Sequence, residues 1–125
     1  MNGYLLWRAA NLWQRNMRAV LSPYGLTPVQ FLLLSGLQEL GGSDDRAVTQ
    51  TMLASHCGTD PMMTSQVLRM LEKTDLVRRA AHDGDRRAVA VTISESGTSL
   101  VNRLAAAVRD ADSLFHAPLA DHSET

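Results

Sequence analysis

The chain has little cysteine, few aromatic residues and no long apolar run. Cys57 is its one cysteine and aromatic residues make up 5% of the 125 residues, so no internal disulfide can form and a reducing cytoplasm is expected. No apolar stretch reaches the roughly 18 residues that a membrane-spanning helix needs. Three arginines interrupt the apolar N-terminal segment, unlike a secretion signal, which places its basic residues ahead of an apolar block. We therefore expect a cytoplasmic protein that is not inserted in a membrane.

The usual sequence signals of metal binding and catalysis are also lacking. None of the four histidines shows the spacing of paired metal ligands on one helical turn. There is no Gly-rich phosphate loop, no Ser-His-Asp order and no evident pair of catalytic carboxylates. His56 beside Cys57 leaves open a reactive thiol, although a buried cysteine is usually an inert small hydrophobe. We expect no metal, no cofactor and no enzymatic activity.

The formal net charge is −1, which argues against a protein that binds nucleic acid by bulk positive charge. The charge is nevertheless unevenly distributed along the chain. Residues 1–38 contain three arginines and no acid, residues 78–87 contain four arginines and two aspartates, and residues 110–125 contain four acids and no lysine or arginine. A protein that presents one basic face to a polyanion remains consistent with these totals.

The length favours a single domain. Its first two elements are expected to be helices. Apolar residues recur at helical spacing over residues 4–21, and Pro23 and Gly25 end this helix. Thr27 and Pro28 then form a helix start signal. The second helix runs to the glycines at 41 and 42 and is apolar nearly all round, which indicates a buried central helix.

A helix-turn-helix pattern follows the polar loop at residues 42–48. A short helix is expected over residues 49–56, with Met52 and Leu53 as its apolar contacts and Gly58 ending it in a left-handed conformation. Asp60 is the expected cap of the next helix, residues 61–73, with Pro61 in its first turn. Two short helices joined by a Gly-containing turn are typical of DNA-binding modules.

The periodicity then changes from helical to alternating. Residues 76–80 predict a strand, residues 82–86 a turn with an Asp-Gly signal, and residues 88–93 the returning strand. Ser94 is placed to cap a long helix that ends near residue 117, before a polar tail at 118–125. The predicted fold is mainly α with a small β-hairpin wing, a winged helix-turn-helix with flanking helices.

The helix over residues 61–73 has the composition of a helix that reads the DNA major groove. Four residues share one face and are expected in the core: Thr64, Val67, Leu68 and Leu71. The others are left outside: Met62, Met63, Ser65, Gln66 and Arg69. Gln pairs well with adenine, Arg with guanine or phosphate, and Met with the thymine methyl group. The alternative is an ordinary amphipathic helix with a solvated polar face.

The predicted hairpin strengthens the DNA-binding interpretation. Asp85 is placed to fix the side chain of Arg87 by a charge-assisted hydrogen bond, and a basic hairpin tip can enter the negative minor groove. An ordinary surface turn with local ion pairs is the alternative. The order of helix, tight turn, polar-faced helix and basic hairpin within residues 49–93 favours a DNA-binding module.

These segments together resemble the MarR family of bacterial regulators. The resemblance covers about residues 4–116, including the helix start at residues 26–31, the short helix at 53–58 and the helix from Asp60 onward. The wing motif of the family, D-x-R-x-x-x-V-x-L-T, is its most specific part. This chain keeps Asp85, Arg87 and Val91 and has Ile93 and Ser94 in the last two positions.

The resemblance implies a homodimer. Residues 1–22 and 94–117 would form the dimerisation helices, residues 27–93 the DNA-binding lobe and residues 118–125 a tail. A single small core cannot easily cover the apolar faces of residues 4–21 and 100–115, which agrees with a dimer. A two-fold dimer would set its recognition helices about one DNA turn apart and favour a palindromic operator.

The resemblance also implies a pocket for a small aromatic effector. The candidate lining residues are Trp7, Trp13, Arg15 and Phe31, with an arginine pairing an effector carboxylate. Aromatic residues at helical spacing belong to a core or a dimer interface just as readily.

The predicted function is sequence-specific binding of double-stranded DNA by a repressing homodimer. Arg87 would enter the minor groove, Ser65 and Gln66 would read the major groove, and Met62 and Met63 would add apolar base contacts. Arg69 and Arg86 would hold phosphate. The near-neutral charge leaves a second hypothesis open, a winged-helix module that docks a protein instead of DNA.

Overall fold

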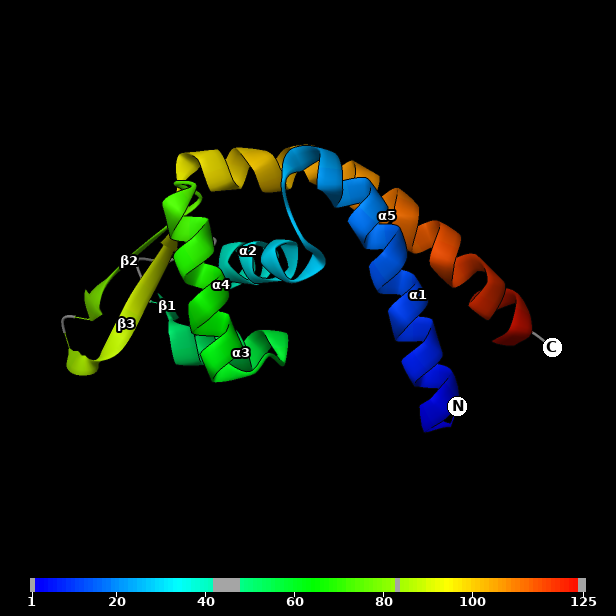
Figure 1. Cartoon of the computed structure of the whole chain (residues 1–125), viewed down its shortest axis with the longest axis horizontal. Helices are drawn as coiled ribbons and strands as arrows, with labels where there is room; N and C mark the ends of the chain where they lie inside the picture. Colours follow the sequence, from blue (N-terminus) through cyan, green and yellow to red (C-terminus); the bar gives the residue numbers. More distant parts are fainter. Residues whose placement is uncertain (1, 42–47, 83, 124–125) are drawn as a thin grey trace. The chain divides into compact units, whose positions relative to one another are not determined.

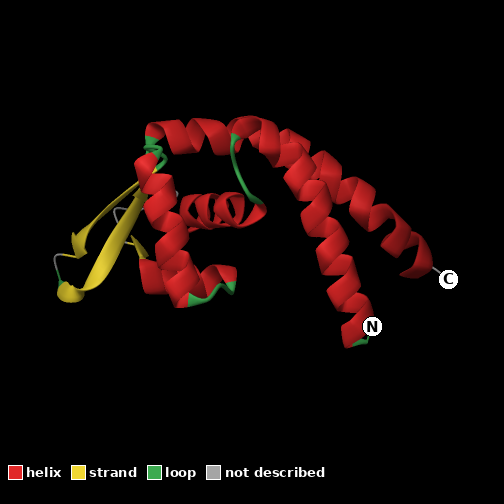
Figure 2. Cartoon of the chain, in the orientation of Figure 1, coloured by secondary structure: helices red, strands yellow, loops and turns green. Residues whose placement is uncertain are grey.

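The structure, a computed structural model, describes residues 2–41, 48–82 and 84–123, with side chains described except at positions 82, 85–87 and 112–123. The chain forms two compact units, residues 1–28 with 102–125 and residues 29–101. The elements in order (Figures 1 and 2) are α1 Gly3–Leu21, the 3-10 helix η1 Ser22–Tyr24, α2 Pro28–Gly41, β1 Val48–Thr49, α3 Gln50–Cys57, α4 Pro61–Lys73, β2 Val77–His82, β3 Asp85–Ile93 and α5 Glu95–Ser123.

The helix starts are encoded locally by capping side chains. The Oδ1 atom of Asn2 accepts the backbone N–H of Leu5 at 2.9 Å at the start of α1. Thr49 accepts the N–H of Met52 at the start of α3. Ser94 accepts the N–H of Gly97 at 3.0 Å in the first turn of α5. Each of these side chains satisfies one of the backbone donors that a helix start leaves unpaired.

A three-stranded antiparallel sheet lies beside the helices of the second unit, in the order β1-β3-β2 (Figure 2). The central strand β3 pairs Val91 with Val48 of β1 on one side and with Arg79 of β2 on the other. Val77 pairs with Ile93 at the base of the β2–β3 hairpin, which we call the wing (residues 77–93). The helix-turn-helix and wing predicted from the sequence are thus confirmed as elements.

The core of the second unit is aliphatic. Leucines of α2, α3 and α4 are fully buried together with inward valines of the sheet, and the largest are Leu33, Leu34, Leu37, Leu53, Leu68, Leu71, Val77 and Val91. Burial of such side chains drives the packing of the helices against the sheet. It confirms α2 as a largely buried helix, although Leu32 keeps 41% of its surface exposed.

The turn after α4 is joined to the start of α5. Asp75 adopts a left-handed φ of 60° where α4 ends, a conformation that costs a non-glycine residue some free energy. The hydroxyl of Ser94 donates to the Asp75 carbonyl at 2.6 Å, and the Ser94 N–H donates to the Leu76 carbonyl at 3.0 Å. A Cβ on Gly97 would collide with the Leu76 carbonyl oxygen, so position 97 needs a glycine.

The first unit contains α1, η1 and the later part of α5. Among its described side chains, the buried ones are Met17, Leu21, Leu26, Leu104 and Val108. Arg103 of α5 lies over the ring of Tyr24 in η1, 5.8 Å from its centroid. Much of α1 stays exposed despite its apolar composition, since Tyr4, Leu6 and Trp7 each keep at least 60% of their surface accessible.

The structure corrects several predicted boundaries. Residues 48–49 form strand β1, whereas the sequence placed residue 48 in a loop; the rest of that loop, residues 42–47, lies outside the described residues. The strands of the wing reach His82 and Asp85, where a five-residue turn was expected. Helix α5 continues to Ser123, through the segment 118–123 that was predicted as a tail. Pro118 removes one helical hydrogen bond but does not end the helix.

Within the described residues, no single helix is long and apolar enough to cross a membrane. Helices 3–24 and 28–41 meet that criterion only when they are combined as a bent pair. Such a pair is weak evidence for a membrane span, because the core helices of a soluble protein pass the same test.

Candidate nucleic-acid interface

The turn between α3 and α4 is built around Gly58. Its φ of 67° is left-handed, as predicted, and its N–H donates to the carbonyls of Ala54 and Ser55. The N–H of Thr59 also donates to Ala54, at 2.9 Å. These bonds satisfy the last carbonyls of α3 and redirect the chain within a few residues.

A buried hydroxyl chain holds the start of α4 against this turn. Asp60 caps α4 through its carboxylate, which accepts the N–H of Met63 at 2.9 Å. Thr64 is fully buried, donates to the Asp60 carbonyl at 2.8 Å and lies 2.7 Å from the hydroxyl of Thr59. The orientation of α4 relative to the turn is therefore fixed by hydrogen bonds as well as by packing.

Helix α4 divides into a buried face and an exposed stripe. Its buried residues are Thr64, Val67, Leu68 and Leu71, the four that the sequence predicted. Its exposed positions that share the opposite face are Met62, Gln66, Arg69, Met70 and Lys73, which we call the α4 stripe. Met63 and Ser65 are half-buried at the two borders of the stripe, so they are less available to a partner than expected.

Met70 and Lys73 were not among the predicted contact residues. Met70 keeps 55% and Met62 keeps 73% of its surface exposed, so both add apolar area to the stripe. Met52, predicted to be a core contact of α3, is 43% exposed instead. Helical spacing alone places Lys73 in line with Met62, Gln66 and Arg69, and that spacing could have identified it.

The backbone of the wing places Asp85, Arg86 and Arg87 at the beginning of β3. The pairing of His82 with Asp85 brings these residues to the end of the hairpin, next to a register irregularity at residues 81–82. The side chains of Asp85, Arg86 and Arg87 lie outside the described ones, and the predicted contact between Asp85 and Arg87 remains a prediction. Figure 1 shows the wing extending beyond the helices α3 and α4 of its own unit.

Arg79 of β2 connects the wing to both helices of the helix-turn-helix. One guanidinium nitrogen donates to the side-chain oxygen of Gln50, the first residue of α3, at 2.9 Å. The other lies 3.2 Å from the carboxylate of Glu72, in the last turn of α4. The sequence reasoning missed this contact, although the alternation of β2 gave a signal: Val77 belongs to the core, so Arg79, two residues on, points to the same side.

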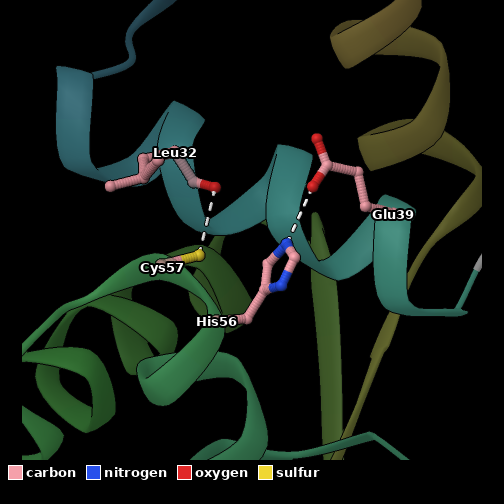
Figure 3. Close-up of polar contacts among 4 residues, drawn as sticks. All are labelled: Leu32, Glu39, His56 and Cys57. Carbon is pink, nitrogen blue, oxygen red and sulfur yellow. Dashed lines mark hydrogen bonds and ion pairs between the residues drawn. The ribbon is translucent and has the colours of Figure 1, made fainter.

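Helices α2 and α3 are joined by polar contacts from Leu32 and Glu39 of α2 to Cys57 and His56 of α3 (Figure 3). A Cβ on Gly36 would lie 2.5 Å from the sulfur of Cys57. That sulfur is 3.7 Å from the carbonyl of Leu32, while the Nε2 atom of His56 is 2.8 Å from the Oε2 atom of Glu39. Both contacts fasten the first helix of the helix-turn-helix to α2.

The environment of Cys57 makes it a poor nucleophile. Burial raises the pKa of the thiol above its ordinary value, and the carboxylate of Glu39 raises it further. The thiolate is the reactive form of cysteine, so a raised pKa lowers reactivity at neutral pH. The side chain is half-buried, whereas a fully buried thiol was expected. Its packing against Gly36 indicates a structural role.

The four candidate effector residues are divided between α1 in the first unit and α2 in the second. Trp7 and Arg15 line one shallow hollow of about 430 Å³ on the surface of α1, together with Arg8, Asn11, Leu12, Gln14 and Arg18. Trp13 is half-buried elsewhere on α1 and does not line this hollow. Phe31 belongs to α2 in the other unit. The sequence could not separate these positions, because helical spacing gives their face but not their partners.

Among the residues that the structure describes, no group of three or more His, Cys, Asp or Glu side chains lies close enough together to hold a metal ion. The described side chains of the second unit therefore offer hydrogen-bonding, basic and apolar groups on the α4 stripe and no metal centre.

Comparison with known proteins identifies the family. The family model described as MarR family matches residues 26–89, half of the chain. The uncharacterized HTH-type transcriptional regulator YdcH of Bacillus subtilis is 36% identical over 115 residues, 92% of this chain and 78% of that protein. The HTH-type transcriptional repressor Rv2887 of Mycobacterium tuberculosis is 34% identical over 110 residues, 88% of this chain and 76% of that protein.

Solved structures agree with the sequence relatives. The M. tuberculosis MarR family protein Rv2887, complexed with p-aminosalicylic acid, superposes with a TM-score of 0.71 at 30% identity, covering 99% of this chain and 93% of that one. A cysteine-to-serine mutant of MarR from E. coli, complexed with operator DNA, gives 0.80 at 21% identity over 90% of this chain and 78% of that one, and this likeness shows the fold alone. The chain therefore belongs to the MarR family and is an HTH-type transcriptional regulator.

Proposed function

We propose that the protein is a homodimeric repressor that binds a palindromic operator in double-stranded DNA. The α4 stripe is the observation that carries this proposal. It combines the amide of Gln66, the cations of Arg69 and Lys73 and two exposed methionines, and the opposite face of the helix is buried. A helix with one buried face and one face of this chemistry suits the major groove.

Each side chain of the interface has a role that follows from its chemistry. Gln66 reads a base edge, with Ser65 at the border of the stripe, and Met62 and Met63 contact thymine methyl groups. Arg69 and Arg86 hold phosphates. Arg87, oriented by Asp85, enters the minor groove, whose negative potential attracts arginine.

The exposed apolar residues of α1 support the homodimer. Tyr4, Leu6, Trp7 and Leu12 each keep half or more of their surface accessible. Exposed apolar patches of this kind are typical of interaction surfaces. Two copies that bury these surfaces around a two-fold axis would present two α4 stripes to one face of a duplex.

A small aromatic acid is the proposed effector. The solved complex of Rv2887 holds p-aminosalicylic acid, an aromatic ring with a carboxylate. Trp7 and Arg15, which share a hollow on α1, offer an aromatic surface and a cation that suit such a molecule. Trp13 does not line this hollow, and Phe31 belongs to α2 in the other unit. The proposed place of action is the cytoplasm, where bacterial DNA lies.

Selection of bound sequences from random duplex DNA tests the proposal. The full chain is incubated with the duplex pool, and the retained DNA is amplified and sequenced over several rounds. We expect a palindrome whose half-sites are separated by about 10 base pairs, one helical turn. Absence of any enriched sequence would reject DNA recognition and favour a winged-helix module that docks a protein.

A further inference from the structure

Arg79 occupies an unusual place for an arginine. Strand β2 alternates, with Val77 fully buried, Arg78 exposed and the Arg79 side chain only 18% exposed. Arg79 therefore faces the interior side of its strand, where an apolar residue would avoid the cost of removing a charge from water. Its Nε atom is buried without a hydrogen-bond partner among the described residues. A side chain held at this cost calls for a function that an apolar residue could not supply.

The contacts of Arg79 join three elements that DNA binding needs in fixed relation. From β2 of the wing it reaches Gln50 at the start of α3 and Glu72 at the end of α4, at 2.9 and 3.2 Å. The planar guanidinium holds both partners at once, which the single ammonium of a lysine does poorly. The bonds therefore fix the wing relative to both helices of the helix-turn-helix.

Glu72 is the only acidic residue of α4. It lies three positions after Arg69 and next to Lys73, the two cations of the α4 stripe. A free Glu72 carboxylate could pair with Arg69, since residues three apart are neighbours on a helix, and it would repel a DNA phosphate. The contact with Arg79 directs that carboxylate towards β2 and leaves the cations of the stripe available.

We propose that Arg79 is a positioning residue for DNA binding, which fixes the wing against α3 and α4 and withdraws the Glu72 carboxylate from the α4 stripe. The inference rests on the proposed function, because it assigns a role within the same interface. Arg79 itself does not contact DNA. It acts through the geometry of the wing and through the charge of the stripe.

The test compares Arg79→Met with Arg78→Met on the same strand. Both variants lose one positive charge, but only Arg79 bridges the helices. Affinity is measured for the duplex enriched by the wild-type chain and for a scrambled duplex of equal length. We expect Arg79→Met to weaken binding of the enriched duplex about tenfold and to leave binding of the scrambled duplex nearly unchanged. Equal losses for the two variants would show that only the charge matters and would overturn the proposal.

The salt dependence separates positioning from direct contact. Each phosphate contact adds about −0.9 to the slope of log affinity against log salt. We expect Arg79→Met to keep the wild-type slope, because Arg79 does not contact phosphate. A slope reduced by about one contact would assign Arg79 to the DNA-contacting residues and refute a positioning role.

A double-mutant cycle with Glu72→Gln isolates the electrostatic part. Removing the carboxylate in the Arg79→Met background should recover part of the lost affinity, because no free acid then remains beside Arg69. The affinity of Arg79→Lys should fall between those of wild type and Arg79→Met. Lysine keeps the positive charge but loses the planar guanidinium that binds two partners at once. Additive losses in the cycle would contradict the role assigned to Glu72.

Hydrogen exchange provides a readout that does not depend on DNA. In Arg79→Met, amides in β2, in the first turn of α3 and in the last turn of α4 should exchange faster, while amides of α1 keep the wild-type rate. Gln50→Ala should reproduce the effect at α3 if Arg79→Met fails to fold. Unchanged exchange in these segments would overturn the proposal even if the chain binds DNA. If no duplex is enriched, the proposed function fails. The hydrogen-exchange result still tests whether Arg79 fixes the wing against α3 and α4.

Discussion

Gly36 of α2 faces the Cys57 sulfur of α3 and has no room for a side chain. We predict that Gly36→Ala destabilises the protein by about 1–3 kcal/mol, because the added methyl group would overlap the Cys57 sulfur. In the Cys57→Ala background the same change should be neutral or stabilising, since alanine favours a helix over glycine by about 1 kcal/mol. Chemical denaturation of the four proteins measures both effects. Equal losses in the two backgrounds would show that the sulfur is not the obstacle.

The thiol of Cys57 also predicts a dependence of stability on pH. Burial and Glu39 raise its pKa in the folded protein, so folding favours the protonated thiol. The resulting contribution to the free energy of unfolding is fully present below the ordinary cysteine pKa. It is lost as the pH rises through the raised pKa of the folded protein.

Wild type should therefore lose unfolding free energy faster than Cys57→Ser above about pH 8.5. Denaturation of both proteins at several alkaline pH values checks this. Parallel stability curves for the two proteins would contradict the raised pKa.

Arg87 is the residue of the wing with the most specific predicted role. We predict that Arg87→Ala weakens binding of the selected duplex about tenfold or more and leaves the thermal unfolding temperature unchanged, because the lost contact is to DNA. Affinity at fixed salt and a thermal melt provide the two measurements. Undiminished affinity would remove Arg87 from the interface.

At the scale of elements, the start of α4 depends on the buried hydroxyl of Thr64. We predict that Thr64→Val costs about 1–2 kcal/mol, because valine keeps the shape but leaves the Thr59 hydroxyl without this partner. Thr59→Ala should add little to the loss once Thr64 has been replaced. Denaturant unfolding of the single and double variants measures the coupling. Fully additive losses would mean that the two hydroxyls act independently.

The helices could be predicted because their signals are local. Asp60 and Ser94, both predicted as caps, lie beside the helices that they start. Asn2 and Thr49 also cap helices, although neither was predicted as a cap. The buried face of α4 followed from spacing alone for the same reason. Local hydrogen bonds and helical periodicity are both visible in a short stretch of sequence.

The parts that the sequence did not predict depend on partners far along the chain. The two residues of β1 are a strand only because β3 pairs with them. Arg79 has its partners on two other elements, and the exposure of Met52 depends on what packs around α3. Pattern reasoning gives the face of a residue but not what lies opposite it, so these contacts needed the structure.

For the molecule as a whole, DNA binding requires an interface that is both sequence-specific and electrostatic. The total charge of −1 cannot attract DNA by itself. Binding must come from a local arrangement, namely the cations of the α4 stripe and the arginines at the end of the wing. A dimer doubles that arrangement on one face of the duplex.

The most direct test is the affinity of the wild-type chain for its selected duplex and for a scrambled duplex over a range of salt concentrations. Fluorescence anisotropy with labelled duplexes gives both affinities under identical conditions. We predict that the selected duplex binds at least about a thousandfold more tightly than the scrambled one, with an affinity that falls steeply as the salt concentration rises. Equal affinities for the two duplexes, or an affinity that salt does not change, would contradict this prediction.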